Sequence, residues 1–580
     1  MSQNNSYVHR EYDQESSSND YVSQMTPSET STLCEVNTSK YVVPIIFLPG
    51  IMGTNLINGK KNVWFPPNGK FQEGFFGVGT LISSIFRSAS DRQKELDPTT
   101  TKVSFDGGIY LKKSEIKLTK KQAYERGWGT VWWTGYGKFL TYLEKYLNNT
   151  LVDLSLEQEF KGSVEWQKVV EQIQTYGKAW ELKDENKQPD AITKKQFHKV
   201  GLVEFPVYAC GYNWLQSNDQ SARDVIERMQ KIKDEYSNSE HPKFLKFIIV
   251  SHSMGGLVTR SIIQQGLMSE DIGGVVHGVQ PASGAPAVYQ RIVNGWDGKA
   301  ATGDFMSSIT ALVMGHNSKR MTPVLANSPG ALQLLPFPNF NDNGEYDWLR
   351  IEIGNRTIKV PINNDPYTNI YTKQNIWWEM INPELVDPSG QLNDRLAKEG
   401  LKNVIDFYHR NIVVVQTFQE DIQDSFHEKT YAHYGADENF KSTAEIIWKA
   451  DEVSIKDLKM MSDDEIIHLG YNKSKDLSES SPYTSDDHIR KVTYTHNGQQ
   501  KSATFTLQVK LRTKGDGTVC YQSGQDVRAK NRNLLETYVI NGYEHGDSYN
   551  NSDVQLNTLY CITKLLNELV SDSEVGNASG

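Results

Sequence analysis

The chain has few cysteines, no excess of basic residues and no long apolar run. Its cysteines, Cys34, Cys210, Cys520 and Cys561, are scattered and form no Cys-x-x-Cys pair or metal-ligand spacing. We expect individually placed thiols, and the spacing does not decide whether a disulfide forms. No apolar stretch reaches the roughly 18 residues that a membrane-spanning helix needs; the nearest candidate, residues 74–86, is interrupted by glycine and serine. The net charge of −10 argues against a nucleic-acid-binding protein, whose surface would be basic.

The first residues also lack the basic patch and apolar stretch of a secretory signal peptide. We therefore expect a protein that is cytoplasmic in the producing cell and carries no visible export signal. Residues 1–38 are polar and poor in apolar side chains, which predicts a disordered tail, and residues 573–580 are predicted to be a flexible C-terminus. Aromatic residues, in contrast, are plentiful at 11% of the chain, enough to line an apolar cleft or an interface.

One segment carries the strongest chemical signal. The apolar, β-branched run at 247–250 ends at Ser251, and an apolar helix pattern opens with glycines at 255 and 256. In α/β-hydrolases a sharp strand-to-helix turn of this kind presents a nucleophilic serine, and Ser253 occupies that place here. The usual motif begins with glycine, where this chain has the small polar Ser251. The alternative is an ordinary glycine turn between a buried strand and a helix.

Apolar runs alternate with helical patterns in the first half of the chain. Residues 41–48 and 274–279, like the run before Ser253, are typical of strands buried on both faces of a parallel sheet. Helical spacing at 136–147 and 221–236 lies between these strands. The alternation predicts an α/β-hydrolase fold with a mostly parallel, doubly wound sheet.

The alternation is lost over residues 287–500, where tryptophans, prolines and charged loops dominate. We predict that this segment is an inserted cap or lid, and that the core lies on either side of it at 39–286 and 501–572. Surface insertions are expected within the first part of the core at about 58–127 and 153–198. Further apolar runs predict a strand inside the insertion at 412–415, core strands at 430–435 and 505–509, and a closing helix at about 553–569.

A nucleophilic serine needs a histidine as base and a carboxylate that orients it. In this fold the order along the chain is Ser, then Asp or Glu, then His. Asp516 follows an apolar run, and His545 is the only histidine beyond it in the sequence. We therefore predict Ser253, Asp516 and His545 as catalytic residues. Asp437 is the alternative acid, and the Asp-Gly pair at 516 is also an ordinary turn signal. His252 is interpreted as structural, with its side chain directed into the helix packing.

Acyl transfer also needs N–H donors aimed at the developing oxyanion. The backbone amide of Met254, next to the nucleophile, is one predicted donor. The other is expected in the loop after the first core strand, where a Pro-Gly corner at 49 and 50 follows the apolar run. Ile51, directly after that corner, is the predicted second donor.

Four segments in this order resemble the lecithin:cholesterol acyltransferase-like lipases, which are related to the GPI inositol-deacylase-like lipases. The segments are residues 48–53, 211–214, 251–256 and 515–519. The resemblance covers about 41–290 and 500–570. It implies the same triad and oxyanion donors, and a lipid ester as substrate. Within this group the chain looks most like bacterial type VI secretion lipase effectors, which are phospholipases exported without a signal peptide.

From these signals we predict a cap-bearing serine hydrolase that cleaves acyl esters of membrane phospholipids without a metal or an organic cofactor. The resemblance implies contact with a target membrane, an immunity protein, a secretion-apparatus partner, and action in the target-cell periplasm. An intracellular carboxylesterase, a lipid acyltransferase and an inactive hydrolase-fold binding protein are the alternatives. Candidate acyl-chain contacts are residues 74–86, 132–133 and 377–378; the other interpretation of each is ordinary packing.

Overall fold

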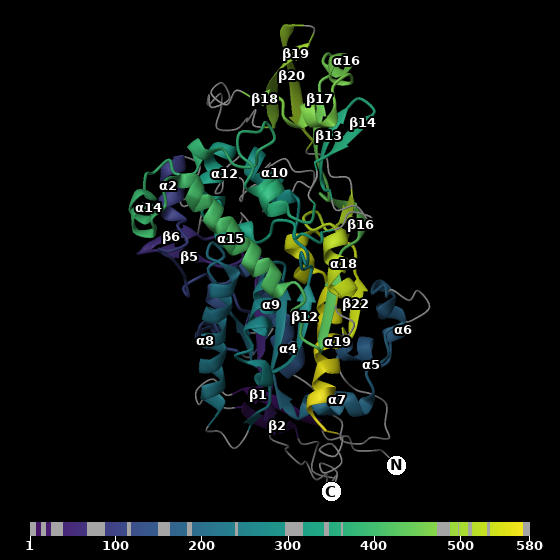
Figure 1. The fold of residues 1–580 in the computed structure, drawn as a ribbon. Helices are drawn as coiled ribbons and strands as arrows, with labels where there is room; N and C mark the ends of the chain where they lie inside the picture. Colours follow the sequence, from purple (N-terminus) through teal and green to yellow (C-terminus); the bar gives the residue numbers. More distant parts are fainter. Residues whose placement is uncertain are drawn as a thin grey trace, which may run out of the picture.

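Two six-stranded sheets organise the chain, one in the body of the molecule and one at its upper end in Figure 1. The structure is a computed structural model. It describes residues 7–12, 19–24, 39–66, 87–112, 116, 118–148, 163–182, 188–237, 242–295, 317–340, 347–360, 363–471, 488–496, 498–508, 513–530 and 534–571.

The sheet in the body of the molecule is parallel. Its strand order is β22-β15-β12-β11-β4-β9, and every neighbouring pair runs in the same direction. The strands are β4 (Ile45–Leu48), β9 (Val207–Ala209), β11 (Phe247–His252), β12 (Ile272–Gly278), β15 (Thr430–Tyr434) and β22 (Glu536–Val539). The predicted parallel α/β core is therefore confirmed, including the core strand predicted at 430–435.

Helices cover both faces of this sheet. Successive side chains of a strand point to opposite sides, so alternate residues pack against different helices. Ile46 and Ile249 pack with α8 (Asn218–Tyr236) and α9 (Gly255–Gln265) in one apolar cluster. The intervening side chains Phe47, Ile248 and Val250 belong to the other cluster, with α4 (Trp133–Asn148) and α19 (Ser552–Leu569). Burial on both faces explains why these strands are continuous apolar runs in the sequence.

The second sheet has the order β14-β13-β17-β20-β19-β18 and lies beyond α10 (Ala287–Asn294) and α12 (Ser318–Leu325) in Figure 1. Its strands are β13 (Leu349–Ile353), β14 (Arg356–Lys359), β17 (Ile446–Ala450), β18 (Gly470–Tyr471), β19 (Ile489–His496) and β20 (Gln499–Leu507). The core strand predicted at 505–509 is therefore wrong. Residues 505–507 belong to β20, which pairs antiparallel with β17 and β19. Alternating burial along β20 suits a sheet packed on one face.

The strand predicted at 412–415 is also wrong, because these residues lie inside the helix α15 (Val404–Ile422). Val413 is 59% exposed while Ile412 and Val415 are buried, which is the helical period rather than the strand period. The Asn403 side chain accepts from two amides of the first turn and caps the helix. A cap and a full amphipathic helix outweigh the β-branched run of Ile and Val.

Arg260 fastens α9 of the core to the end of α15. Its guanidinium donates to the carbonyls of Ile422, Gln423 and Ala282 at 2.6–3.1 Å and lies over the Phe426 ring. Burial lowers the pKa of Arg260 to about 9. The carbonyls at the end of a helix carry partial negative charge, so they stabilise the buried cation.

Two segments outside the core differ from the polar surface stretches expected of them. Within residues 1–38, β1 (Tyr7–Tyr12) and β2 (Asn19–Gln24) pair antiparallel, so the expectation of disorder does not hold there. Within 153–198, Trp166 is fully buried in the cluster of α4 and α19. The last described residues, up to 571, follow α19, and the predicted flexible C-terminus at 573–580 lies outside the described residues.

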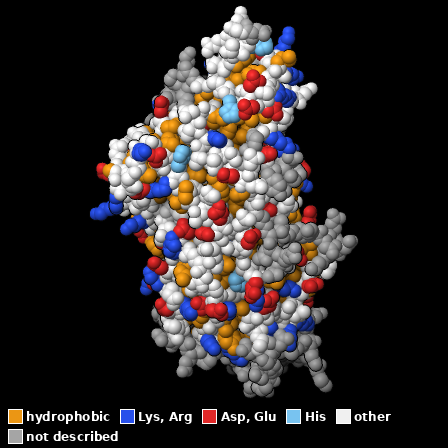
Figure 2. Space-filling model, viewed as in Figure 1, with side chains coloured by type: hydrophobic (Ala, Val, Ile, Leu, Met, Phe, Trp, Pro, Cys, Tyr) orange, Lys and Arg blue, Asp and Glu red, His pale blue; other side chains and the backbone are white. Residues whose placement is uncertain are grey.

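In the described ranges no helix is both long and apolar enough to cross a membrane. On the face shown in Figure 2, acidic and basic side chains are interspersed, and small hydrophobic patches lie among them. Charge of one sign does not gather over the core on this face.

Candidate active site

The strand-to-helix turn after β11 holds Ser253 in a left-handed backbone conformation, with φ of 52°. A non-glycine residue adopts such a φ only when the surrounding structure fixes it. The turn is tight, because a Cβ on Gly255 would lie 2.6 Å from the carbonyl oxygens of Leu48 and Pro49. The following helix therefore needs glycine at that position, and the predicted turn geometry is present.

Ser251 occupies the usual glycine position of the motif without disturbing the turn. It is fully buried, and its Oγ is 2.8 Å from Nδ1 of His277 on the neighbouring strand β12. A hydrogen-bonded hydroxyl is tolerated inside a core where an unpaired one would be costly. His277 thus explains how this chain accommodates serine in place of glycine.

The structure brings Ser253, His545 and Asp516 into one hydrogen-bonded chain. The Ser253 Oγ is 2.8 Å from Nε2 of His545, and Nδ1 of His545 is 2.7 Å from Oδ2 of Asp516. His545 follows β22 and begins a short helix, while Asp516 follows β21 (Thr513–Gly515). Proton donation from Nδ1 to the carboxylate leaves Nε2 as the acceptor for the serine hydroxyl. The spacing suits a nucleophile, a base and an orienting acid.

Backbone groups hold the carboxylate of Asp516 in place. Its Oδ1 accepts from the amides of Thr518 and Val519 at 3.1 and 2.7 Å, and its own carbonyl accepts from the His545 amide at 2.7 Å. The alternative acid, Asp437, lies on β16 (Asp437–Ser442), which pairs with β21. Its oxygens accept from the amides of Gly542 and Asn439. Asp437 therefore braces the loops around the site, while Asp516 contacts the histidine.

The loop after β4 lies beside the turn that carries Ser253. In the part of the chain that the structure describes, neither the Ile51 amide nor the Met254 amide donates to a protein acceptor. Met52 has a φ of 64°, which turns the loop sharply after Ile51. Two unpaired amides flanking a nucleophile are the donor set that a developing oxyanion requires.

Two buried aromatic residues fix this loop. The Tyr212 hydroxyl donates to the Pro49 carbonyl at 2.8 Å, and the Trp64 Nε1 donates to the Met52 carbonyl at 2.6 Å. Tyr212 belongs to the segment 211–214, which is one of the four segments that carry the family resemblance. The sequence predicted no role for this segment. The role of Tyr212 in the structure is to hold the loop in position.

His252 is buried against Tyr136 of the helix α4, which agrees with the structural interpretation of its side chain. The sequence did not indicate its hydrogen bonds: one ring nitrogen bonds to the Tyr136 hydroxyl and the other to the backbone carbonyl of His545. Tyr136, on α4, was missed altogether. The one sequence signal for it is its place on a predicted amphipathic helix, which also fits an ordinary core residue.

The site is covered. Ser253 is 4% exposed, and the side chains of Asp516 and His545 are 2% and 13% exposed. The pair at 377–378 does not line it as an open acyl-chain contact, because both tryptophans are buried and donate to the carbonyls of Ile466 and Ile467. Trp132 is buried as well, and residues 74–86 lie outside the described residues.

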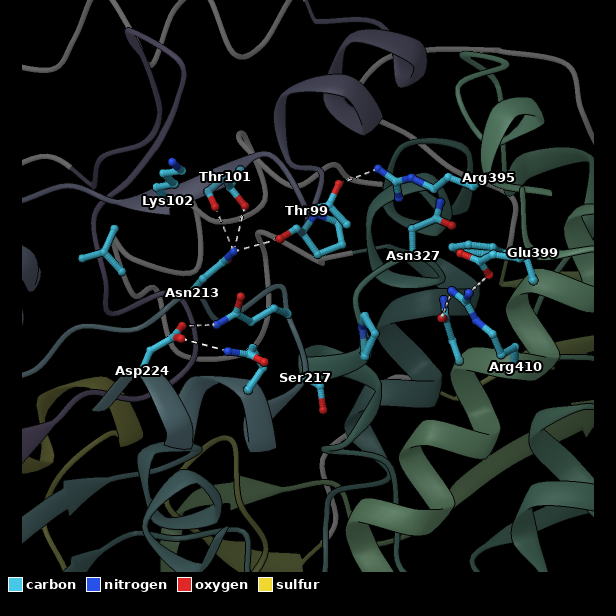
Figure 3. Close-up of a pocket in the computed structure, with 17 residues that line it drawn as sticks. Thr99, Thr101, Lys102, Asn213, Ser217, Asp224, Asn327, Arg395, Glu399 and Arg410 are labelled. Atoms are coloured by element: carbon cyan, nitrogen blue, oxygen red, sulfur yellow. Dashed lines mark hydrogen bonds and ion pairs between the residues drawn. The ribbon is translucent and has the colours of Figure 1, made fainter. Parts of the chain in front are cut away.

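A polar groove of about 570 Å³ opens between the segment at 98–103, the start of α8 and the helices α14 (Asn393–Glu399) and α15. Figure 3 shows Asn213 and Asp224 on one side of it and Arg395, Glu399 and Arg410 on the other. None of the three residues in the Ser253 chain lines this groove. Two arginines of the groove form ion pairs, Arg395 with Asp97 and Arg410 with Glu399. The groove is therefore distinct from the covered site.

Two buried histidines near the site make stability depend on pH. Burial lowers the pKa of His277 and of His433 to about 3, from an ordinary value of 6.5. Above pH 6.5 both are neutral in the folded and unfolded states. Below pH 6.5 the unfolded chain binds protons that the folded chain does not. The free energy of unfolding therefore decreases as the pH is lowered from about 6.5 to about 3.

We therefore expect His433→Leu to reduce the loss of unfolding free energy on acidification. Within the described part of the chain neither ring nitrogen of His433 has a partner, so leucine removes no hydrogen bond. The slope should fall by up to about 1.4 kcal/mol per pH unit between about pH 6 and pH 4. Urea unfolding of both proteins at several pH values measures this. Equal slopes would show that His433 titrates normally in the folded state.

A parallel α/β core with a Ser–His–Asp chain at the end of its strands is consistent with an α/β-hydrolase. Neither a family model nor a curated protein matches the chain. Among solved structures, the chain is similar to the crystal structure of the Tle4-Tli4 complex, with a TM-score of 0.69 and 28% identity over 91% of this chain and 99% of that one. The resemblance to type VI lipase effectors, which the overall layout and the missing signal peptide indicated, is confirmed by this neighbour.

Proposed function

We propose that the chain is a serine-dependent lipase that hydrolyses acyl esters of membrane phospholipids and acts as a type VI secretion effector. The observation that carries this proposal is the hydrogen-bonded chain from Asp516 through His545 to Ser253. The similarity to Tle4 supports the lipase effector class. Within that class, Ser253 is the nucleophile, His545 the base, and Asp516 the orienting acid.

The proposed reaction has two steps. His545 Nε2 accepts the Ser253 proton as Oγ attacks the ester carbonyl, and the oxyanion that forms lies at the amides of Ile51 and Met254. His545 then gives its proton to the departing alcohol oxygen of the lysophospholipid, which leaves an acyl-serine. A water molecule gives a proton to His545 and attacks the acyl-serine, and His545 returns that proton to Ser253 Oγ as the fatty acid leaves.

Asp516 stabilises the imidazolium that forms in each step and holds the ring in the tautomer with its proton on Nδ1. Its burial matters, because water would weaken that interaction. The residues supply base, acid and oxyanion donors for this reaction from the chain itself.

We propose that the part of residues 287–500 outside β15 forms a cap over the site. β15 belongs to the parallel core sheet, and the second sheet continues to the end of β20 at Leu507, past the predicted boundary at 500. The low exposure of Ser253 supports a covered resting state, and the Arg260 contacts fasten the end of α15 to the helix behind the nucleophile. A lipid acyl chain then reaches Ser253 only after the cover moves.

The solved neighbour is a complex of Tle4 with Tli4. This supports the proposal that the present chain also has a protein partner that acts as its immunity protein. The chain is further proposed to act at the membrane of a target cell and to have a partner in the secretion apparatus.

Lipid mass spectrometry tests the proposed function. The purified chain is incubated with vesicles of phosphatidylethanolamine and phosphatidylglycerol, with and without an added alcohol. We expect lysophospholipid and free fatty acid to accumulate in equal amounts. An acyl ester of the added alcohol in place of free fatty acid would favour the acyltransferase alternative, and unchanged lipids would overturn the proposal.

A further inference from the structure

A second set of hydrogen bonds joins the loop after β4 to His545 behind the nucleophile. The Gly50 amide donates to the Tyr136 hydroxyl at 3.1 Å, and that hydroxyl is 2.9 Å from Nδ1 of His252. On the far side of the same ring, Nε2 of His252 is 3.0 Å from the carbonyl oxygen of His545. Tyr136 and His252 are each 4% exposed, so water does not compete for these bonds.

Hydrogen-bond chemistry fixes the direction of each bond. The His545 carbonyl can only accept, so Nε2 of His252 carries the ring proton and donates it. When the ring is neutral, Nδ1 is an acceptor and takes the Tyr136 hydroxyl proton, while the tyrosine oxygen accepts from Gly50. This arrangement also pairs the hydroxyl proton of Tyr136, which a charged ring that donates from Nδ1 would not. Burial and the neighbouring His545 lower the pKa of His252 well below its ordinary value.

The fit around these bonds is close. A Cβ on Gly50 would lie 2.8 Å from Nδ1 of His252 and 2.9 Å from the Ser253 Cβ. A Cβ on Gly53 would lie 2.8 Å from the Tyr136 hydroxyl. The loop therefore rests directly on the Tyr136–His252 pair, and movement of either side chain shifts the loop.

We propose that Tyr136 and His252 are positioning residues. They fix the loop after β4, which carries the proposed oxyanion donor Ile51, relative to the base His545. Gly50 precedes the proposed donor Ile51, so the bond to Tyr136 orients the peptide next to it. The bond from His252 to the His545 carbonyl orients the backbone whose ring must reach Ser253. This inference rests on the proposed function, because it assigns both ends of the hydrogen-bond chain to one reaction.

Turnover of p-nitrophenyl butyrate by single variants tests the role. Tyr136→Phe removes the hydroxyl and nothing else, and we expect kcat to fall by about 10- to 100-fold with KM changed by less than about threefold. His252→Leu should show a similar loss. His252→Gln should recover most of it, because a side-chain amide can donate to the His545 carbonyl.

Tyr371→Phe is the matched control. Tyr371 is fully buried, and its hydroxyl donates to the Pro336 carbonyl at 2.6 Å rather than to a residue of the Ser253–His545–Asp516 chain or of the loop after β4. We expect it to lower the melting temperature as Tyr136→Phe does while leaving kcat unchanged. If Tyr136→Phe and Tyr371→Phe behave alike, or if glutamine at 252 is no better than leucine, the positioning role is overturned.

A measurement that does not depend on turnover separates this inference from the proposed function. In ¹⁵N-histidine NMR spectra of the whole chain, assigned with His252→Gln, His252 should be neutral with its proton on Nε2 from about pH 6 to pH 8. A proton on Nδ1 or a charged ring would overturn the hydrogen-bond chain even in an active enzyme. If Ser253→Ala retained turnover, the proposed function would be wrong. The NMR spectra would still show which nitrogen of His252 carries the proton, and so would still test the hydrogen-bond chain.

Discussion

Replacement of Ser253 by alanine is expected to lower the turnover of p-nitrophenyl butyrate by about 10⁴- to 10⁶-fold. The substitution removes the Oγ that lies 2.8 Å from the base and leaves every backbone contact of the turn. Far-UV circular dichroism and the melting temperature should therefore match those of the unaltered protein. Turnover within tenfold of normal in a folded variant would mean that another group is the nucleophile.

The second large effect is expected from Asp516→Asn, which should reduce kcat by about 10⁴-fold. The amide offers no negative charge to the imidazolium, and its NH₂ group favours the ring tautomer whose proton is on Nε2. Nε2 then cannot accept the Ser253 proton. Steady-state kinetics on the same ester measures the loss.

Asp437→Asn is the matched control for that substitution. Asp437 was the alternative acid, and its carboxylate accepts from the amides of Gly542 and Asn439 rather than from His545. We expect its kcat to stay within a few-fold of normal and its melting temperature to fall slightly. If Asp437→Asn lowered kcat more than Asp516→Asn, Asp437 rather than Asp516 would be the acid that orients His545.

The sequence was most informative where neighbouring residues decide the structure. The turn at Ser253 depends on a buried strand, small flanking residues and a helix start, which are contiguous along the chain. The order of Ser253, Asp516 and His545 follows from a fold-level rule, and the structure places the three within hydrogen-bonding distance. Local pattern and chain order together were sufficient for that prediction.

Where tertiary packing decides, the sequence was less informative. Residues 505–509 alternate between apolar and polar side chains, which suits a strand buried on one face, and pairing with β17 and β19 assigns residues 505–507 to the second sheet. The β-branched run at 412–415 favours a strand locally, but α15 packs as a helix. The environment of His252 depends on Tyr136 and on the backbone of His545, which are 116 and 293 residues away along the chain. No local pattern brings such distant residues together.

The central claim is that Ser253 is the nucleophile of an ester hydrolase, and covalent labelling tests it most directly. The protein is treated with a fluorophosphonate probe, digested, and analysed by peptide mass spectrometry. We predict one labelled peptide, modified at Ser253, and no labelling of Ser253→Ala or of heat-denatured protein. A label on another residue, or none on a folded protein that still hydrolyses lipid, would contradict the account.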